Sequence, residues 1–398
     1  MIKDWLTLYF TPQIGIRRFH HLLQSFTDIH EILSADNRAW QAVGIPQSAQ
    51  SRRDDPKIGR EVETSLTWLN ASPLHHIITL DHALYPPLLK TLPDAPPLLF
   101  IKGNPTMLSE PQLAIVGTRH PTEEGKRHSH AFARELSMRG FVITSGLAMG
   151  VDGEAHRAVV EANNRTIGVL GTGLESIYPK RHQSLSESII DRGGALVSEF
   201  PLGTPPKATN FPRRNRIIAG LSLGTLVVEA AKRSGSLITA RLALEYNREV
   251  FAIPGSIHNP HAKGTHQLIR DGATLTESVA DILRELSGWY DSTLESKSET
   301  SSEPKAKSIP SIEPNSRQKP VPSPINSSIS APPNAPLNAP SDPTERKLFE
   351  ALQTPLTIDE LVERLELETS TLMTTLLTLE LEGFVANIGS GRYQQTLG

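Results

Sequence analysis

A cluster of cations around one aromatic residue, between Pro205 and Gly220, is the stretch best suited to chemistry with a polyanion. The segment reads PPKATNFPRRNRIIAG. Lysine and arginine neutralise phosphates, and an aromatic face stacks on an unpaired base, a contact of about 1 to 3 kcal/mol per base. The pattern therefore predicts a binding site for a single nucleic-acid strand. Its candidate residues are Lys207, Phe211, Arg213, Arg214, Asn215 and Arg216.

A second interpretation of the same segment stays open. The segment is then a solvated turn, with Phe211 in the core and Asn215 capping a helix that begins at Arg216. Arg216 can have a structural role even if its neighbours bind a strand.

A further group of candidates follows the ends of predicted strands. The apolar runs 113–116 and 141–144 each lead into small or polar residues, and a Ser-Gly turn precedes the helical segment that starts near Leu237. The carboxyl ends of parallel strands share one edge of a sheet. There glycine permits close approach, and helix amino ends offer free N–H groups to an anion. The candidates at this edge are Arg119, Ser145, Gly146, Arg233, Ser234, Gly235 and Ser236.

Six apolar runs that alternate with helical segments between residues 112 and 290 must position these side chains. Such alternation is typical of an α/β fold with one doubly wound parallel sheet. Strands are predicted at 113–116, 141–144, 166–170, 195–198, 225–228 and 250–253, and helices at 123–138, 153–163, 183–191 and 236–247.

The segments before the sheet are predicted to differ from it and from each other. Residues 1–70 have apolar positions at helical spacing, with glycine-containing breaks at 14–16 and 43–46. Such breaks can bind a DNA phosphate in a helix-hairpin-helix unit, although ordinary turns in a small helical domain are favoured. Residues 71–111 are rich in proline and are predicted to be an extended connection into the sheet.

The segments after the sheet are predicted to be a tether and a small domain. Residues 291–343 hold 11 of the 31 prolines and no aromatic residue, so they are predicted to be a disordered linker. Residues 344–398 are predicted to form three helices and a hairpin, the winged-helix arrangement. The third helix, 369–382, has no lysine or arginine, which leaves open whether this domain contacts DNA or protein.

Composition excludes several classes of function. The net charge of −3 argues against a uniformly basic surface, and the absence of cysteine excludes disulfides, thiolate metal sites and thiol catalysis. No Walker-type GxxxxGK[ST] sequence is present, no GxGxxG follows the first strand, and no metal or cofactor is expected. Without a signal peptide or a long apolar run, we expect a soluble cytoplasmic protein that does not enter the membrane.

Several ionisable residues outside these groups are not expected to carry chemistry. Glu199 and Glu229 stand at strand ends, but nothing near them in sequence supplies a nucleophile. Asp152 and His156, four residues apart at a helix start, more often form a cap and an ion pair than a proton relay. The histidines make poor metal sites, since His128 and His130 point to different helix faces and the loop histidines lack an acidic neighbour at ligand spacing. The loop histidines are His258, His261 and His266.

The sequence resembles the DNA-processing protein A (DprA, also called Smf) family. The resemblance runs from about Pro86 to Leu286 and is carried by six motifs in one order. They are IVGTR ending at Arg119, SGLAMGVDGEAH from Ser145, VLGTGLESIYP from Val169, FPRRNRIIAGLS from Phe211, RSGSLITARLALE from Arg233 and FAIPGS from Phe251.

The resemblance implies a function as well as a fold. It implies an extended Rossmann-like domain that binds single-stranded DNA, forms a homodimer and loads a RecA-type recombinase on incoming DNA during natural transformation, without catalytic turnover. By resemblance, Arg119 would contact phosphate, Phe211 would cover a base, and the basic residues around Asn215 would line the groove. Ser145, Gly146 and the turn 234–236 would shape the floor. Lys207 stands near the position of the family's pocket lysine.

Two alternatives remain open. Related sheets host enzymes that release a base from nucleoside monophosphates, but this chain has RSGSLIT where those enzymes have PGGxGT. A domain that binds only protein is the other alternative, and it would not shift an oligonucleotide at low salt.

Overall fold

The structure of the chain is a computed structural model, which describes residues 2–287, 343–365, 369–381, 384–387 and 392–395. Contacts divide the chain into two compact units, Met1–Leu294 and Glu295–Gly398. Each unit has its own apolar core. The predicted tether, 291–343, lies outside the described residues except for Pro343.

Six helices form the amino-terminal part of the first unit. Apolar side chains at helical spacing, among them Phe19 and Leu22, gather in one small core. Trp40 completes it and donates its indole N–H to the carbonyl oxygen of Ile32 at 2.8 Å. Gly44, in the second predicted break, has a φ of +75°, a conformation that favours glycine. The helices are α1 (Ile2–Phe10), α2 (Ile16–Ser25), α3 (Ile29–Ser34), α4 (Asn37–Ala42), α5 (Gln47–Gln50) and α6 (Pro56–Asn70).

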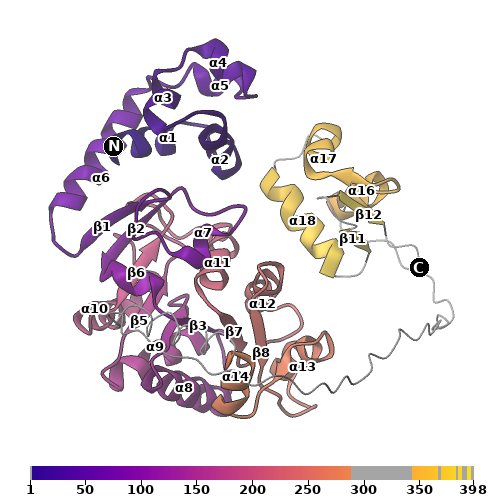
Figure 1. The fold of residues 1–398 in the computed structure, drawn as a ribbon. Helices are drawn as coiled ribbons and strands as arrows, with labels where there is room; N and C mark the ends of the chain where they lie inside the picture. Colours follow the sequence, from indigo (N-terminus) through magenta and orange to yellow (C-terminus); the bar gives the residue numbers. More distant parts are fainter. Residues whose placement is uncertain (1, 288–342, 366–368, 382–383, 388–391, 396–398) are drawn as a thin grey trace, which may run out of the picture. The chain divides into compact units, whose positions relative to one another are not determined.

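One sheet of nine strands organises the rest of this unit (Figure 1). The strand order is β1-β2-β6-β5-β4-β3-β7-β8-β9, and the strands from β6 to β9 pair in parallel. The predicted α/β fold is confirmed, and each predicted strand begins within one residue of its expected start. The strands are β1 (His75–Thr79), β2 (Leu98–Gly103), β3 (Gln112–Val116), β4 (Val142–Ser145), β5 (Thr166–Val169), β6 (Ala195–Ser198), β7 (Gly224–Val227), β8 (Glu249–Ala252) and β9 (Thr274–Leu275).

The prediction of an extended connection over 71–111 was wrong. That segment forms β1 and β2, which pair antiparallel with each other, and β2 pairs antiparallel with β6. The sheet is therefore mixed rather than purely parallel. The prolines that suggested a connection flank β2 instead of interrupting it, so every backbone N–H of the strand stays free for pairing. Two short helices complete the segment: α7 (Pro87–Lys90) and the 3-10 helix η1 (Pro105–Ser109).

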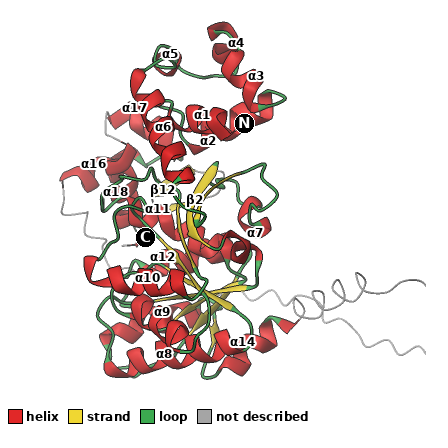
Figure 2. Ribbon diagram, turned by 90° about the vertical axis from the view of Figure 1, so that its left-hand side faces the viewer, coloured by secondary structure: helices red, strands yellow, loops and turns green. Residues whose placement is uncertain are grey.

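Helices cover both faces of the sheet, as Figure 2 shows. Two of the predicted helices match their observed bounds, and α11 begins at Asn210. Asn215 therefore lies inside α11, and the alternative in which it caps a helix starting at Arg216 was wrong. The helices are α8 (Glu123–Met138), α9 (Val151–Glu161), α10 (Gln183–Asp191), α11 (Asn210–Leu221), α12 (Ser236–Glu245), α13 (Lys263–Arg270) and α14 (Val279–Glu285), with the 3-10 helices η2 (Lys180–His182) and η3 (Pro260–Ala262).

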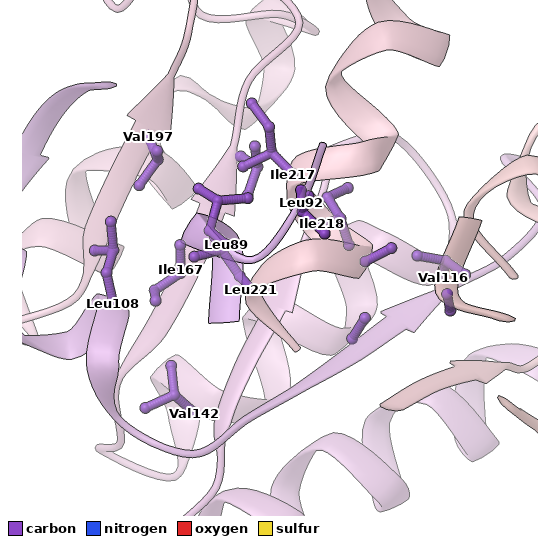
Figure 3. Packing of buried hydrophobic residues seen from close by; sticks show 14 of the residues in the cluster. Leu89, Leu92, Leu108, Val116, Val142, Ile167, Val197, Ile217, Ile218 and Leu221 are labelled. Atoms are coloured by element: carbon purple, nitrogen blue, oxygen red, sulfur yellow. The ribbon is translucent and has the colours of Figure 1, made fainter. Parts of the chain in front are cut away.

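Alternation along each strand builds a core on either side of the sheet. In β3, Leu113 packs on one face with Phe132 of α8, whereas Val116 belongs to the cluster on the other face. Figure 3 shows this second cluster, in which Leu89 and Ile217 belong to α7 and α11. Since β3 is central and buried on both faces, the loop that follows it begins at a fixed place on the sheet edge.

The second unit contains three helices and a three-stranded sheet. The strand order is β10-β12-β11, with both pairs antiparallel. Leucines of all three helices gather in one core. The elements are α16 (Pro343–Ala351), β10 (Leu356–Thr357), α17 (Ile358–Leu365), α18 (Thr369–Leu381), β11 (Val385–Asn387) and β12 (Arg392–Gln395).

Within the described residues, none of the helices has the length and apolar character that crossing a membrane requires.

Candidate nucleic-acid interface

A pocket of about 620 Å³ lies at the carboxyl ends of the central strands. The chain order of the strands reverses there, because β4 to β6 extend to one side of β3 and β7 to β9 to the other. Ligands of open α/β sheets bind at such a switch point. The lining residues are Val116, Gly117, Thr118, Arg119, His120, Ala148, Asp152, Tyr178, Pro206, Ala208, Phe211, Pro212, Arg214, Asn215, Ile218, Ser234, Gly235, Ser236, Ile238 and Thr239.

Arg119 and Phe211 meet in this pocket although they are far apart in sequence. Arg119 is exposed and follows β3, and Phe211 is half-buried in the first turn of α11. The guanidinium carbon of Arg119 lies 5.7 Å from the centroid of the Phe211 ring, within the range of a cation–π contact. A phosphate at Arg119 and a base on Phe211 would therefore belong to the same nucleotide or to adjacent ones.

Arg214 also lines the pocket, but it is buried rather than solvated. Its Nη1 donates to the carbonyl oxygen of Gly146 at 2.6 Å and to that of Val169. These carbonyls belong to the ends of β4 and β5, so Arg214 joins α11 to both strands. Burial lowers the pKa of Arg214 to about 10, opposed by the nearby Asp152 carboxylate. The group stays charged at neutral pH and adds a positive potential under the pocket floor.

Asp152 organises the loop after β4. Its carboxylate accepts the backbone N–H of Gly146 at 3.0 Å. Burial raises the pKa of Asp152, while Arg214 and the hydrogen bonds to the loop oppose that rise. The predicted ion pair with His156 does not describe the structure, since the Nδ1 atom of His156 contacts the hydroxyl of Thr166 at 2.8 Å instead.

Two glycines leave room for the side chains of α11. A Cβ atom at Gly171 would lie 2.8 Å from the Cδ1 atom of Phe211, and one at Gly146 would lie 2.6 Å from the Nη1 atom of Arg214. Both distances are shorter than side chains tolerate without a shift. Glycine at the strand ends was expected to permit close approach of a ligand, but protein side chains occupy part of that space.

The turn before α12 contacts α11 across the pocket. Asn215 donates its side-chain N–H to the carbonyl oxygen of Gly235 at 3.3 Å. The hydroxyls of Ser234 and Ser236 lie 2.7 Å apart. The structure thus brings these residues together with Arg119 and Phe211, and their part in binding stays a prediction.

Arg216 does not line the pocket, in contrast to the prediction. It is 5% exposed, and its guanidinium is paired with Glu199 and lies 3.5 Å from a carboxylate oxygen of Asp94. Its position in α11 turns it away from Phe211 and toward the carboxyl end of β6. We therefore assign Arg216 a structural role.

Other predicted residues lie around the pocket rather than in its lining. Lys207 and Arg213 are exposed, and the Arg213 guanidinium carbon lies 5.4 Å from the centroid of the Phe200 ring. Arg233 is exposed beside the turn that precedes α12. Ser145 is fully buried and donates to the carbonyl oxygen of Ile115 at 2.6 Å, so it supports the floor without facing a ligand.

The two carboxylates at strand ends both have structural partners. Glu199 accepts from Arg216. Glu229 accepts the hydroxyl of Thr122 at 2.6 Å and its backbone N–H at 2.9 Å, and Thr122 caps α8. Neither residue lines the pocket. Among the described residues, no group of three or more histidines and carboxylates is placed to hold a metal ion.

Tyr178 is one of several lining residues that did not figure among the predicted site residues. Tyr178 follows β5, and its ring centroid lies 5.6 Å from that of Phe211. Its signal was present in the sequence, since Lys180 and Arg181 follow Tyr178 and a proline, as Arg213 and Arg214 follow Phe211 and a proline.

Comparisons with known proteins agree with this architecture. A family model described as DNA recombination-mediator protein A matches residues 76–287, and a model of the DprA winged helix domain matches residues 331–390. Protein Smf of Escherichia coli (strain K12) is 53% identical over 227 residues, which are 57% of this chain and 60% of that protein. Protein Smf of Synechocystis sp. is 37% identical over 323 residues, which are 80% of this chain and 79% of that protein.

Among solved structures, the X-ray structure of DNA processing protein A from Streptococcus pneumoniae is similar to this chain. It is 35% identical and has a TM-score of 0.56, with 68% of this chain and 98% of that chain covered. The predicted fold, with its winged-helix domain at the carboxyl end, is confirmed.

Proposed function

The chain belongs to the DNA recombination-mediator protein A family, and on this premise we propose that it binds single-stranded DNA in the pocket at the switch point of its sheet. Recombination mediators act on DNA strands, so a strand-binding site is required. The observation that carries the proposal is the contact between Arg119 and Phe211, which places a cation and an aromatic face 5.7 Å apart in one pocket.

The pocket favours an unpaired strand over a duplex. Phe211 is half-buried and lines the pocket beside the strand ends, so only a base that has left its partner can stack on it. Duplex bases are stacked on each other and paired, and unstacking them costs a few kcal/mol per step. A single strand does not incur this cost and still offers its phosphates to Arg119.

The steps beyond DNA binding form the second part of the proposal. We propose that the protein acts as a homodimer, protects incoming single strands in the cytoplasm, and loads a RecA-type recombinase on them during natural transformation. The description of the family as recombination mediators supports this part. The boundaries proposed for the helical domain, the linker and the winged-helix domain are 1–70, 291–343 and 344–398. The sheet domain, predicted as 112–290, extends back to include 71–111, because β1 and β2 belong to the sheet.

The proposed activity does not require catalytic turnover. Base release from a nucleotide needs an acid or base near the sugar, and Glu199 and Glu229 are both hydrogen-bonded away from the pocket lining. Asp152 lines the pocket but is engaged with the backbone of Gly146. An assay for free base released from nucleoside monophosphates is expected to give no signal above the buffer blank.

Binding titrations of a labelled oligothymidylate test the proposal, with fluorescence anisotropy at about 50 and about 200 mM salt. We expect Arg119→Ala to weaken binding and to lower the salt slope by about one. Phe211→Ala should weaken binding by about five- to 100-fold with little change in salt slope. Equal affinity of both variants and wild type would contradict the site.

A matched control separates the site from a general loss of positive charge. Arg139 lies at the carboxyl end of α8, at the opposite edge of the sheet, and its side chain is 50% exposed. Arg139→Ala removes the same charge as Arg119→Ala and should leave the affinity nearly unchanged. A duplex of the same length should bind more weakly than the single strand at both salt levels.

A further inference from the structure

Tyr178 gives the pocket a second aromatic face. It lies in the loop between β5 and η2, and 43% of it is exposed. It lines the main pocket together with Arg119 and Phe211, and also a small adjoining recess that includes Arg214. A tyrosine whose main role is packing would be buried in a cluster, as Tyr85 is. Tyr178 instead keeps much of its ring available beside the cations.

The angle between the two rings determines how they can be used. The ring centroids of Tyr178 and Phe211 are 5.6 Å apart, and the ring planes are tilted by 46°. A base held between two rings needs about 3.5 Å on each side, so this spacing does not admit one. Each ring therefore offers a face of its own, and the two faces form an angled platform.

An angled platform suits two consecutive bases of a single strand. Bases that rest on planes tilted by 46° are not parallel to each other, a geometry that a stacked duplex excludes and an unpaired strand permits. The pocket volume of about 620 Å³ is also in the middle of the range that accommodates drug-sized ligands, about 300 to 1,000 Å³, which is more than one base requires.

We infer that Tyr178 is a second base-stacking residue, so that the pocket takes a dinucleotide step. One base stacks on Phe211, with a phosphate at Arg119, and the neighbouring base stacks on Tyr178. This inference rests on the proposed function, because it assigns the second nucleotide of the same single-stranded ligand. It also gives the site a minimal ligand of two unpaired nucleotides.

Competition by short ligands against a labelled oligothymidylate tests the inference on the full chain. The ligands are thymidine monophosphate, pT, and the dinucleotide pTpT. The wild type should bind pTpT about tenfold more tightly than pT, since each stacked base contributes at least about fivefold. Tyr178→Ala should bind the two ligands with similar affinity, and Phe211→Ala should weaken both.

Three further variants keep the result interpretable. Tyr178→Phe retains the ring and should keep the preference for pTpT, whereas Tyr178→Leu retains apolar bulk and should lose it. Met138, 63% exposed at the end of α8, provides Met138→Ala as a control that changes neither affinity. This pattern would be absent if Tyr178 merely stabilised its loop.

The two proposals fail in different ways. A wild type that binds the oligothymidylate but does not prefer pTpT over pT overturns the dinucleotide step alone. If Tyr178→Ala keeps the wild-type ratio of pTpT affinity to pT affinity, the dinucleotide step is overturned and the proposed function stands. A wild type that does not bind the oligothymidylate overturns the proposed function, and the inference with it.

Discussion

The arginines predicted to bind a strand have different roles in this molecule because their burial differs. Arg119 is exposed and faces a pocket that a ligand can enter. Arg214 and Arg216 are 4% and 5% exposed and are hydrogen-bonded within the protein. A buried guanidinium without partners would be strongly unfavourable, so these two residues are held by carbonyl and carboxylate oxygens. Only the exposed group is free to exchange water for a phosphate.

The pair of Arg216 and Glu199 leads to a stability prediction. Glu199→Gln should lower the free energy of unfolding by about 3 to 5 kcal/mol, because it leaves the buried Arg216 without its main counter-charge. Arg213→Ala, at an exposed position of the same helix, is the control and should cost less than about 1 kcal/mol. Urea unfolding measures both variants.

A double variant separates the pair from its surroundings. Glu199→Gln combined with Arg216→Met should lose less stability than the two single variants added together, because the combination removes both charges from the interior. Additive losses would show that the two side chains act independently.

His156 leads to a prediction about pH. It is fully buried, its Nε2 atom has no hydrogen-bond partner among the described residues, and burial lowers its pKa to about 3. The unfolded chain, with an ordinary pKa near 6.5, binds the proton first. The stability contributed by neutral His156 is therefore present above about pH 6.5 and is lost as the pH falls, by at most about 1.4 kcal/mol per unit.

Urea unfolding at about pH 7 and about pH 5 checks this prediction. His156→Asn can keep the contact with Thr166 but does not titrate, so its stability should fall less between the two pH values than that of the wild type. His128→Asn, at a partly exposed position of α8, should fall as steeply as the wild type. Parallel losses in His156→Asn and wild type would rule out His156 as the titrating group.

The sequence predicted the residue types of the site better than their burial. Arg213, Arg214 and Arg216 are the same residue type, and their positions around the axis of α11 decide which of them faces solvent. These positions are set only if all three residues lie in the helix, and α11 begins at Asn210 rather than at Arg216. Tyr178 was missed because its neighbour in the pocket, Phe211, is 33 residues away in sequence.

At the scale of elements, α11 is the helix that connects the pocket to the sheet. Its first turn carries Phe211, its middle is fixed to β4 and β5 by Arg214 and to the end of β6 by Arg216, and Ile217 packs in the core below. The position of the aromatic face therefore depends on the strand ends that α11 contacts.

A substitution at a strand end should move that face. In Gly171→Ala, the new Cβ atom would lie 2.8 Å from Phe211, and the exposed side of the pocket lets the ring move away. We expect single-strand affinity to fall by about five- to tenfold, with the free energy of unfolding changed by less than about 1 kcal/mol. Anisotropy titration and urea unfolding measure the two effects.

Gly59→Ala is the matched control, since it adds the same methyl group inside α6, where no atom lies within 4 Å of the new Cβ. It should leave the affinity unchanged and slightly raise stability, as alanine favours helix. If Gly171→Ala binds as tightly as Gly59→Ala, the position of Phe211 does not limit binding.

Elements were predictable where their pattern is local and periodic. Six of the parallel strands, β3 to β8, and helices such as α8 and α10 follow from apolar runs and helical spacing in the sequence alone. β1 and β2 were missed because β1 pairs with β2, and β2 pairs with β6, whose partner residues lie 92 to 98 positions further along the chain. Prolines around them are locally typical of a connection, and only long-range pairing shows otherwise.

At the scale of the whole molecule, the two units are expected to contribute unequally to DNA binding. All residues of the pocket belong to the first unit, Met1–Leu294. The second unit has a separate core, and its longest described helix, α18, carries neither lysine nor arginine. A helix that reads a duplex usually contacts phosphates through cations. The winged-helix domain is therefore expected to contribute little to DNA affinity.

A chain that ends at residue 287 tests this division. It keeps the whole pocket and the sheet with its covering helices, and the cores of the first unit contain no residue from beyond Leu286. We expect it to fold, and to bind oligothymidylate with the affinity and salt slope of the full chain to within about twofold, because the number of phosphates neutralised is the same. Anisotropy titrations of both proteins at two salt levels make the comparison.

Arg119→Ala should weaken the shortened chain as much as the full one. If the shortened chain folds but loses most of its affinity or its salt slope, the second unit contacts the strand despite the absence of cations on α18.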